Sequence, residues 1–291
     1  MNSFKVSVIT PVYNAEKFLE NAVNSALFHD CVNEVILIED NSPDDALAIC
    51  MALEEKHDRV KLYRHPNGEN KGAGASRNLG IEKATCDYIA FLDADDWYEP
   101  NRFEAEKELL KNKPSIDGVY GATGFYYENK KEKDPTRLTS FSKYIEPPKL
   151  LDELIKPGGG RFTTDAITVK KSLLLKLGGF DTSLRLHQDS HLWLRLAYHG
   201  NLVTGIIDNP IAYRRVHDDN RITKANRKTA ILYHRKVYDE FRTKNDIDKK
   251  TMRMIFKNVI INQTESNNNI IRGLIGIKEV ISNPSLIRKI I

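Results

Sequence analysis

Short apolar runs alternate with amphipathic stretches over the first hundred residues of the chain. Strand-like runs cover residues 6–10, 34–39, 60–65 and 87–94. Helical spacing lies between them, over residues 15–28, 43–56 and 72–84. Short apolar strands that alternate with helices of this length are typical of βαβ units, in which helices cover both faces of a parallel sheet. We therefore expect an α/β fold in which residues 1–115 form a nucleotide-binding half.

The pattern loosens after a further predicted helix at residues 99–112. A Tyr-rich strand at 119–127 leads into a polar stretch, rich in Lys and Glu, at 128–137. Later strands are expected at residues 166–169 and within 201–217. We interpret residues 116–224 as an acceptor-facing half that packs on the same sheet.

The C-terminal region, residues 225–291, is dominated by helical periodicity. Its last part has an apolar stripe at helical spacing, formed by Ile270, Leu274, Ile277 and Ile281. The region carries 14 Lys and Arg against 6 Asp and Glu, in a chain whose formal net charge is +4. Two roles are open. The region either docks as an interfacial helix on an anionic membrane or packs its apolar face on the domain formed by the preceding residues.

Composition narrows the class of protein. The 291 residues are 41% hydrophobic and 29% charged, which is ordinary for a folded globular chain. The three cysteines, Cys31, Cys50 and Cys86, have no CxxC spacing, so neither a disulfide framework nor a zinc site is expected. There is no apolar run of about 18 residues and no secretory pattern at the start. We expect a cytoplasmic protein in a reducing compartment, with the inner face of the cell membrane as the site of any peripheral contact.

Three carboxylates follow the most hydrophobic strand, in the string Asp93-Ala94-Asp95-Asp96. A side-chain period of two would place Asp93 and Asp95 on the same side. Ligands bind at the carboxyl ends of strands in open α/β sheets, and clustered carboxylates there are best explained by a hard divalent cation with oxygen ligands. A solvated acidic turn is the alternative for such a motif taken by itself.

The sequence motifs on either side of this string favour the metal site over the solvated turn. They are SVITPVYN at 7–14, LIEDNSPDD at 37–45, NKGAGASRNLG at 70–80 and FLDADD at 91–96, with GGFD at 178–181 further on. In this order they resemble family 2 glycosyltransferases over roughly residues 4–217. The resemblance implies a GT-A fold: a Rossmann-like, mostly parallel mixed sheet with helices on both faces, here followed by a helical tail. It also implies a nucleotide-sugar donor and inversion at the transferred carbon.

The resemblance implies contacts for the donor. Pro11, Val12 and Tyr13 would border the nucleobase, and Asp40 would accept a hydrogen bond from the base, usually uracil. Asp93 and Ala94 would lie near the ribose and the metal. The chain has Glu39-Asp40-Asn41 where the family often has Asp-Asp-Gly, which makes Glu39 a less certain contact. Pro11 and Tyr13 could instead simply shape the turn after the first strand.

The resemblance makes Asp95 the direct ligand of Mn²⁺ or Mg²⁺. His217 aligns with a position near the metal or diphosphate, and an exposed loop histidine is the alternative. Arg77 lies on a helix opened by Gly72 to Gly74, whose N-terminus favours anions. Arg77 would contact the donor or pair with Asp93 or Asp96. The glycine string differs from the dinucleotide fingerprint and follows the third strand, which disfavours a Rossmann oxidoreductase.

Asp189 falls where the family places its catalytic base. The segment usually reads Glu-Asp and here reads Gln188-Asp189. With a helix from about His187, Asp189 would share one face with Leu192, Trp193 and Leu196. The alternative is an acidic residue in the first helical turn that interacts with the helix dipole.

The predicted function is transfer of a single sugar, from a UDP-hexose or UDP-N-acetylhexosamine to the hydroxyl of a glycan or lipid-linked acceptor. The rival from another class is a catalytically inactive nucleotide-sugar-binding or glycan-binding module. A nucleotidyltransferase would need a basic, Gly-rich loop after the first strand, and residues 11–18 do not supply one. Nucleic acid is not an expected partner, because residues 1–224 are net acidic and phosphate contacts need a basic face.

Overall fold

A computed structural model describes residues 4–113, 115–217, 227–263, 272 and 276–278. Its main sheet has seven strands in the order β10-β6-β9-β4-β1-β2-β3. These strands are β1 (Val6–Val12), β2 (Val32–Glu39), β3 (Val60–Arg64), β4 (Tyr88–Phe91), β6 (Gly118–Tyr120), β9 (Ile167–Lys170) and β10 (Leu202–Thr204). Strand β1 pairs in parallel with β2 and β4, whereas β9 runs antiparallel to β4 and β6. The predicted α/β fold with a mostly parallel mixed sheet is confirmed.

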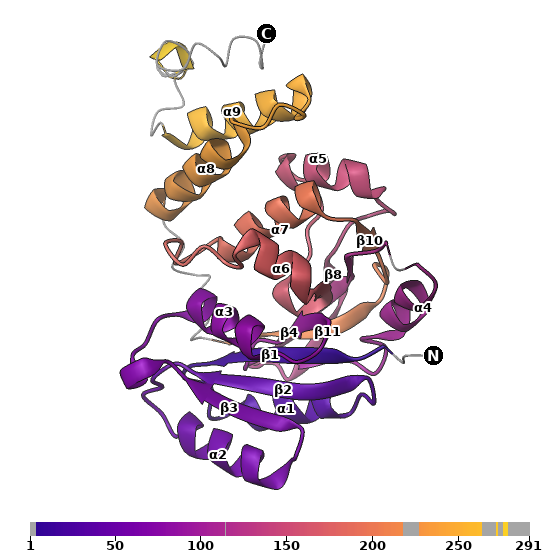
Figure 1. The fold of residues 1–291 in the computed structure, drawn as a ribbon, viewed down its shortest axis with the longest axis vertical. Coiled ribbons are helices and arrows are strands. Elements are labelled where there is room, and N and C mark those ends of the chain that lie inside the picture. Colours follow the sequence, from indigo (N-terminus) through magenta and orange to yellow (C-terminus); the bar gives the residue numbers. More distant parts are fainter. Residues whose placement is uncertain (1–3, 114, 218–226, 264–271, 273–275, 279–291) are drawn as a thin grey trace.

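Helices cover both faces of this sheet (Figure 1). On one side lie α1 (Leu19–Leu27) and α2 (Ala46–Lys56), and on the other α3 (Ala73–Lys83), α6 (Lys171–Leu177) and α7 (Gln188–His199). Strand alternation divides the core between the faces. In β2, Val35 and Leu37 belong to the apolar cluster beneath α1 and α2, and Ile36 and Ile38 belong to the cluster beneath α3. This double burial explains the unbroken apolar run from Val35 to Ile38 in β2.

A second sheet has four strands in the order β5-β11-β7-β8. They are β5 (Trp97–Tyr98), β7 (Ala122–Tyr127), β8 (Glu132–Thr139) and β11 (Pro210–Val216). The expectation that residues 116–224 pack on one sheet is therefore only partly right: β6, β9 and β10 join the main sheet, and β7, β8 and β11 do not. Gly121 lies at the break between β6 and β7. A Cβ there would lie 2.7 Å from the carbonyl oxygen of Ile206, so the close backbone approach at this break requires glycine.

Two predicted boundaries differ from the structure. The polar stretch 128–137 enters strand β8, which pairs antiparallel with β7 at the edge of the second sheet. Edge strands carry charged side chains at little cost because one side faces water, so their composition hides them. The helix predicted over 99–112 begins later, as α4 (Glu104–Asn112), because Trp97 and Tyr98 pair with β11.

The C-terminal helices α8 (Arg227–Phe241) and α9 (Lys249–Gln263) pack on the rest of the fold beside α7 and α5 (Leu150–Ile155) (Figure 1). Val237, Tyr238 and Phe241 are buried there, and Lys236 Nζ lies 2.8 Å from Asp181 Oδ2. Of the predicted apolar stripe, Ile270, Leu274 and Ile281 lie outside the described residues, and Ile277 is 58% exposed. None of the helices within the described residues is both long and apolar enough to cross a membrane.

Candidate active site

The Asp93–Asp96 turn follows β4 at the sheet edge where β1 and β2 also end. The strand stops at Phe91, and the Asp96 N–H donates to the Asp93 carbonyl over 3.0 Å. Strand alternation therefore does not set the side-chain directions beyond this point. The expectation that Asp93 and Asp95 share a side for that reason is wrong: Asp93 groups with Asp96, and Asp95 lies against His217.

Asp93, Asp96 and Asp165 form a carboxylate cluster, in which one oxygen from each lies within 4.8 Å of the others. Asp165 precedes β9 and accepts the Asp93 N–H over 2.9 Å. Asp96 and Asp165 are buried. Burial, together with the charge of Asp93, raises the pKa of Asp165 to about 7, and burial and the charge of Asp165 raise that of Asp96.

These residues fit a hard divalent cation. Crowded carboxylates that are withdrawn from water are stabilised by a proton or by a metal ion, and oxygen donors are what Mg²⁺ and Mn²⁺ prefer. Beside the cluster, His217 Nε2 lies 3.0 Å from Asp95 Oδ2. The structure thus brings together the two residues predicted to hold the metal, although 122 positions separate them. Their role as ligands stays a prediction.

Arg77 lies on α3 and faces the cluster. Its guanidinium donates a hydrogen bond to Asp93 Oδ1 and packs over the Phe180 ring, with 5.4 Å to the ring centroid. Burial works against its charge, but Asp93, Asp189 and Asp165 together raise the Arg77 pKa. The pairing with Asp93 expected as one role of Arg77 is therefore present. The contact of Arg77 with the donor stays a prediction.

Asp189 lies in the first turn of α7, which begins at Gln188 as expected. Leu192, Trp193 and Leu196 are buried, while Asp189 is half-buried near the charge of Arg77. The start of α7 abuts the start of α3, since a Cβ on Gly74 would lie 1.9 Å from Gln188 Oε1. The Gln188 side chain therefore lies directly against the backbone of Gly74.

Helix α8 approaches the same end of α7. The Tyr233 ring centroid lies 5.1 Å from that of His187, the residue that caps α7 in a left-handed conformation with φ 62°. Burial and the charge of Asp189 raise the pKa of Tyr233. Asp189 therefore lies between α3 on one side and α8 on the other.

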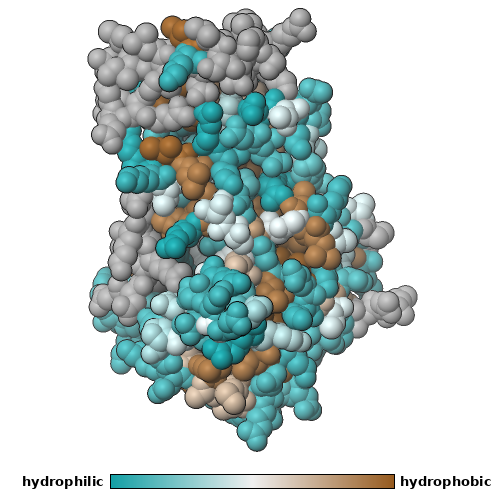
Figure 2. All heavy atoms as spheres, turned by 60° about the vertical axis from the view of Figure 1, so that its left-hand side comes forward, coloured by the Kyte–Doolittle hydropathy of each residue, from teal (hydrophilic) through white to brown (hydrophobic). Residues whose placement is uncertain are grey.

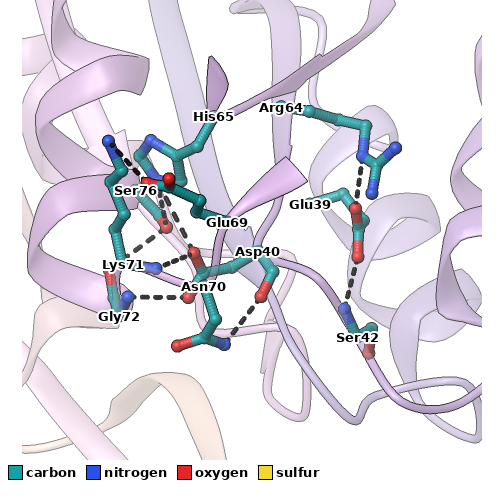
Figure 3. Close-up of polar contacts among 10 residues, drawn as sticks. All are labelled: Glu39, Asp40, Ser42, Arg64, His65, Glu69, Asn70, Lys71, Gly72 and Ser76. Atoms are coloured by element: carbon teal, nitrogen blue, oxygen red, sulfur yellow. Dashed lines mark hydrogen bonds and ion pairs between the residues drawn. The ribbon is translucent and has the colours of Figure 1, made fainter. Parts of the chain in front are cut away.

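The predicted nucleobase contacts lie where β1 and β2 end. Val12 is buried, Pro11 is half-buried and Tyr13 is 40% exposed. Asp40 is buried, and its two carboxylate oxygens accept the N–H groups of Lys71 and Gly72 over 2.7 and 2.8 Å (Figure 3). Asp40 thus holds the loop before α3 onto the end of β2. Its contact with a base stays a prediction.

Glu39, which departs from the family pattern, is bound within the protein. One carboxylate oxygen accepts the Ser42 N–H over 2.5 Å, and the other pairs with Arg64 Nε at 2.6 Å (Figure 3). The Glu39 side chain, which is longer than the aspartate of the family pattern, stabilises the turn after β2. It lies on the opposite side of this turn from the Asp40 contacts (Figure 3).

Sequence reasoning missed two residues of the site, Asp165 and Arg215. Asp165 meets Asp93 across 72 positions, and no local pattern marks such a contact. Arg215 donates from its Nε to the Asp95 carbonyl over 2.9 Å. The sequence did carry a signal for Arg215, since strand alternation places it on the same side as His217, which is two positions later.

Comparisons with known proteins agree with this geometry. The model of the family described as "Glycosyl transferase family 2" matches residues 7–176. An uncharacterized glycosyltransferase of Haemophilus influenzae is 43% identical over 111 residues, which are 38% of this chain and 44% of that protein. The putative teichuronic acid biosynthesis glycosyltransferase TuaG of Bacillus subtilis is 29% identical over 233 residues, covering 78% of this chain and 86% of TuaG.

Among solved structures, S. aureus TarS 1–349 in complex with UDP-GlcNAc superimposes with a TM-score of 0.65 at 17% identity. The superposition covers 89% of this chain and 71% of the TarS chain. A likeness at this identity concerns the fold, and it confirms the GT-A-type architecture expected from the sequence.

Proposed function

Because the chain belongs to glycosyl transferase family 2, we propose that this glycosyltransferase moves a single sugar from a UDP-hexose or UDP-N-acetylhexosamine to a hydroxyl of a glycan or lipid-linked acceptor, with inversion. The observation that carries the proposal is the carboxylate cluster of Asp93, Asp96 and Asp165 beside the Asp95–His217 pair, with Arg77 hydrogen-bonded to Asp93. Asp189 is near enough for its charge to help raise the Arg77 pKa. The TarS complex with UDP-GlcNAc supports a uridine donor. Residues 1–224 would form the catalytic domain, with donor contacts in residues 1–115.

Asp95 and His217, with the neighbouring carboxylates, would hold Mn²⁺ or Mg²⁺. When bound, the cation supplies Lewis-acid stabilisation of the negative charge that develops on the departing diphosphate. Arg77 keeps Asp93 oriented toward this place through its hydrogen bond. Asp40 positions the loop that opens α3, and Pro11, Val12 and Tyr13 border the base.

Asp189 acts as the general base. The acceptor oxygen attacks the anomeric carbon from the face opposite the diphosphate, and its proton passes to an Asp189 carboxylate oxygen. As the new carbon–oxygen bond forms, the bond to the UDP oxygen breaks and UDP leaves with the electron pair. One displacement of this kind inverts the anomeric centre.

The proposal is tested by a panel of nucleotide sugars, assayed for hydrolysis and thermal stabilisation with Mn²⁺, Mg²⁺ or EDTA. We expect one UDP-sugar to raise the melting temperature in the presence of metal and to be hydrolysed slowly by water. Stabilisation without hydrolysis or transfer would favour the inactive binding module. A panel in which only non-uridine nucleotides stabilise the protein would contradict the donor class.

We also propose that the C-terminal region contacts anionic membrane at the inner face of the cell membrane. Lys249, Lys250, Arg253 and Lys257 are exposed on α9, although the apolar side chains of α8 and α9 pack on the domain. On the face that Figure 2 shows, the hydrophobic side chains of the described residues lie in patches among hydrophilic ones. The exposed positive charges of α9 would carry the proposed contact.

The full chain is expected to co-sediment with vesicles that contain phosphatidylserine at low salt, and to be released as salt rises, because screening weakens contacts between exposed charges. Neutral phosphatidylcholine vesicles are the control. Equal recovery with neutral and anionic vesicles would leave the C-terminal helices with the packing role alone.

A further inference from the structure

Arg215 is held at the junction between the two sheets. It lies near the end of β11, which pairs with β5 and β7 in the second sheet, and two positions before His217. Its side chain is 11% exposed. The side chain therefore lies inside the protein, next to the Asp93–Asp96 turn.

Arg215 binds the turn through both its backbone and its side chain. The Arg215 N–H donates to Asp96 Oδ1 over 2.7 Å, and Nε donates to the Asp95 carbonyl over 2.9 Å. These two contacts hold consecutive residues of the turn. They also leave the Asp95 carboxylate directed at His217.

The rest of the guanidinium is fixed from other elements. One terminal nitrogen lies 2.5 Å from Glu128 Oε2, and the other donates to Asn21 Oδ1 over 3.3 Å. The group also stacks among the rings of Phe18 and Trp97, with 4.6 and 4.8 Å to the centroids. A planar, fork-shaped cation satisfies all of these contacts at once, which the compact ammonium of lysine does not.

We infer that Arg215 is a positioning residue for the metal: it fixes the Asp93–Asp96 turn against His217, so that Asp95 and His217 bind the cation as one preformed site. The inference rests on the proposed metal-dependent function. Arg215 itself would touch neither the cation nor the sugar. Residues that orient metal ligands typically change metal affinity about 10- to 100-fold when they are replaced.

Arg215→Met is the main test, measured as Mn²⁺ binding to the full chain by calorimetry and electron paramagnetic resonance, with the melting temperature recorded in parallel. We expect the Kd for Mn²⁺ to rise about 10- to 100-fold. Arg215→Lys keeps the charge and loses the fork, and we expect it to weaken Mn²⁺ binding in the same direction. Arg215→Lys also provides the test of Mn²⁺ binding if Arg215→Met does not fold.

Arg137→Met is the matched control. Arg137 lies in the same sheet, packs over Phe125 with 3.9 Å to the centroid, and donates to the Tyr127 hydroxyl over 2.9 Å. It has the same kind of ring contact, away from the turn, so its loss should leave the Kd for Mn²⁺ unchanged.

The measurements distinguish failure of the positioning role of Arg215 from failure of the proposed metal-dependent function. If the wild type binds Mn²⁺ and a folded Arg215 variant binds it equally well, the positioning role is wrong and the proposed function stands. If the wild type binds neither Mn²⁺ nor Mg²⁺, with or without UDP, the metal of the proposed function is wrong and this inference fails with it.

Discussion

Asp95→Ala is expected to abolish metal-dependent sugar transfer. The substitution removes the carboxylate that lies 3.0 Å from His217 and leaves the diphosphate to meet Asp93 and Asp96 without a bridging cation. A metal ion contributes several kcal/mol of charge stabilisation in the transition state, and about 1.4 kcal/mol corresponds to tenfold in rate. We therefore expect a loss of about 10³-fold or more in turnover.

The same variant should lose UDP binding that depends on metal. Calorimetry with UDP, with and without EDTA, compares the wild type, Asp95→Ala and the control Asp58→Ala, which changes an exposed acidic residue in the turn before β3. The control should bind UDP as the wild type does. If UDP binding were insensitive both to EDTA and to the loss of Asp95, the metal-bridged site would be wrong.

Asp189→Asn is expected to keep the fold and the donor affinity and to lose transfer. The amide has nearly the same volume but cannot take the proton of the acceptor hydroxyl. Loss of a positioned general base typically costs about 10²- to 10⁴-fold in rate. The effect should be in kcat, measured with the acceptor or as donor hydrolysis, while the Kd for the UDP-sugar stays the same.

Asp181→Asn is the control for Asp189→Asn. Asp181 lies eight positions earlier, and burial opposes its charge, yet hydrogen bonds from Lys236 and Ser183 lower its pKa to about 2. Such an acid is a poor base, so this variant should retain most of the activity. Near wild-type transfer by Asp189→Asn, with a large loss in Asp181→Asn or in a His187 variant, would move the base to that residue.

The elements of residues 1–115 could be predicted because their patterns are local. Strands β1, β2 and β4 are largely buried on both faces and therefore read as apolar runs, while the helices between the strands keep a polar face. The start of α7 was also predictable from the segment around His187. In contrast, β8 was missed and the second sheet was merged with the first, since partners in those strands come from distant parts of the chain and edge strands tolerate polar residues.

The chemistry offered at the strand ends could be read from the chain alone: Asp40 after β2, the Gly72 to Gly74 opening of α3 and the carboxylates after β4. What each of these side chains contacts became clear only in the folded protein. Asp40 accepts backbone N–H groups, Arg77 pairs with Asp93, and the buried carboxylate of Asp165 joins from 72 residues away. This difference arises because periodicity and motif order report the local backbone and the face that each residue occupies. Hydrogen bonds, burial and pKa shifts depend instead on neighbours that only the folded chain brings within a few ångströms.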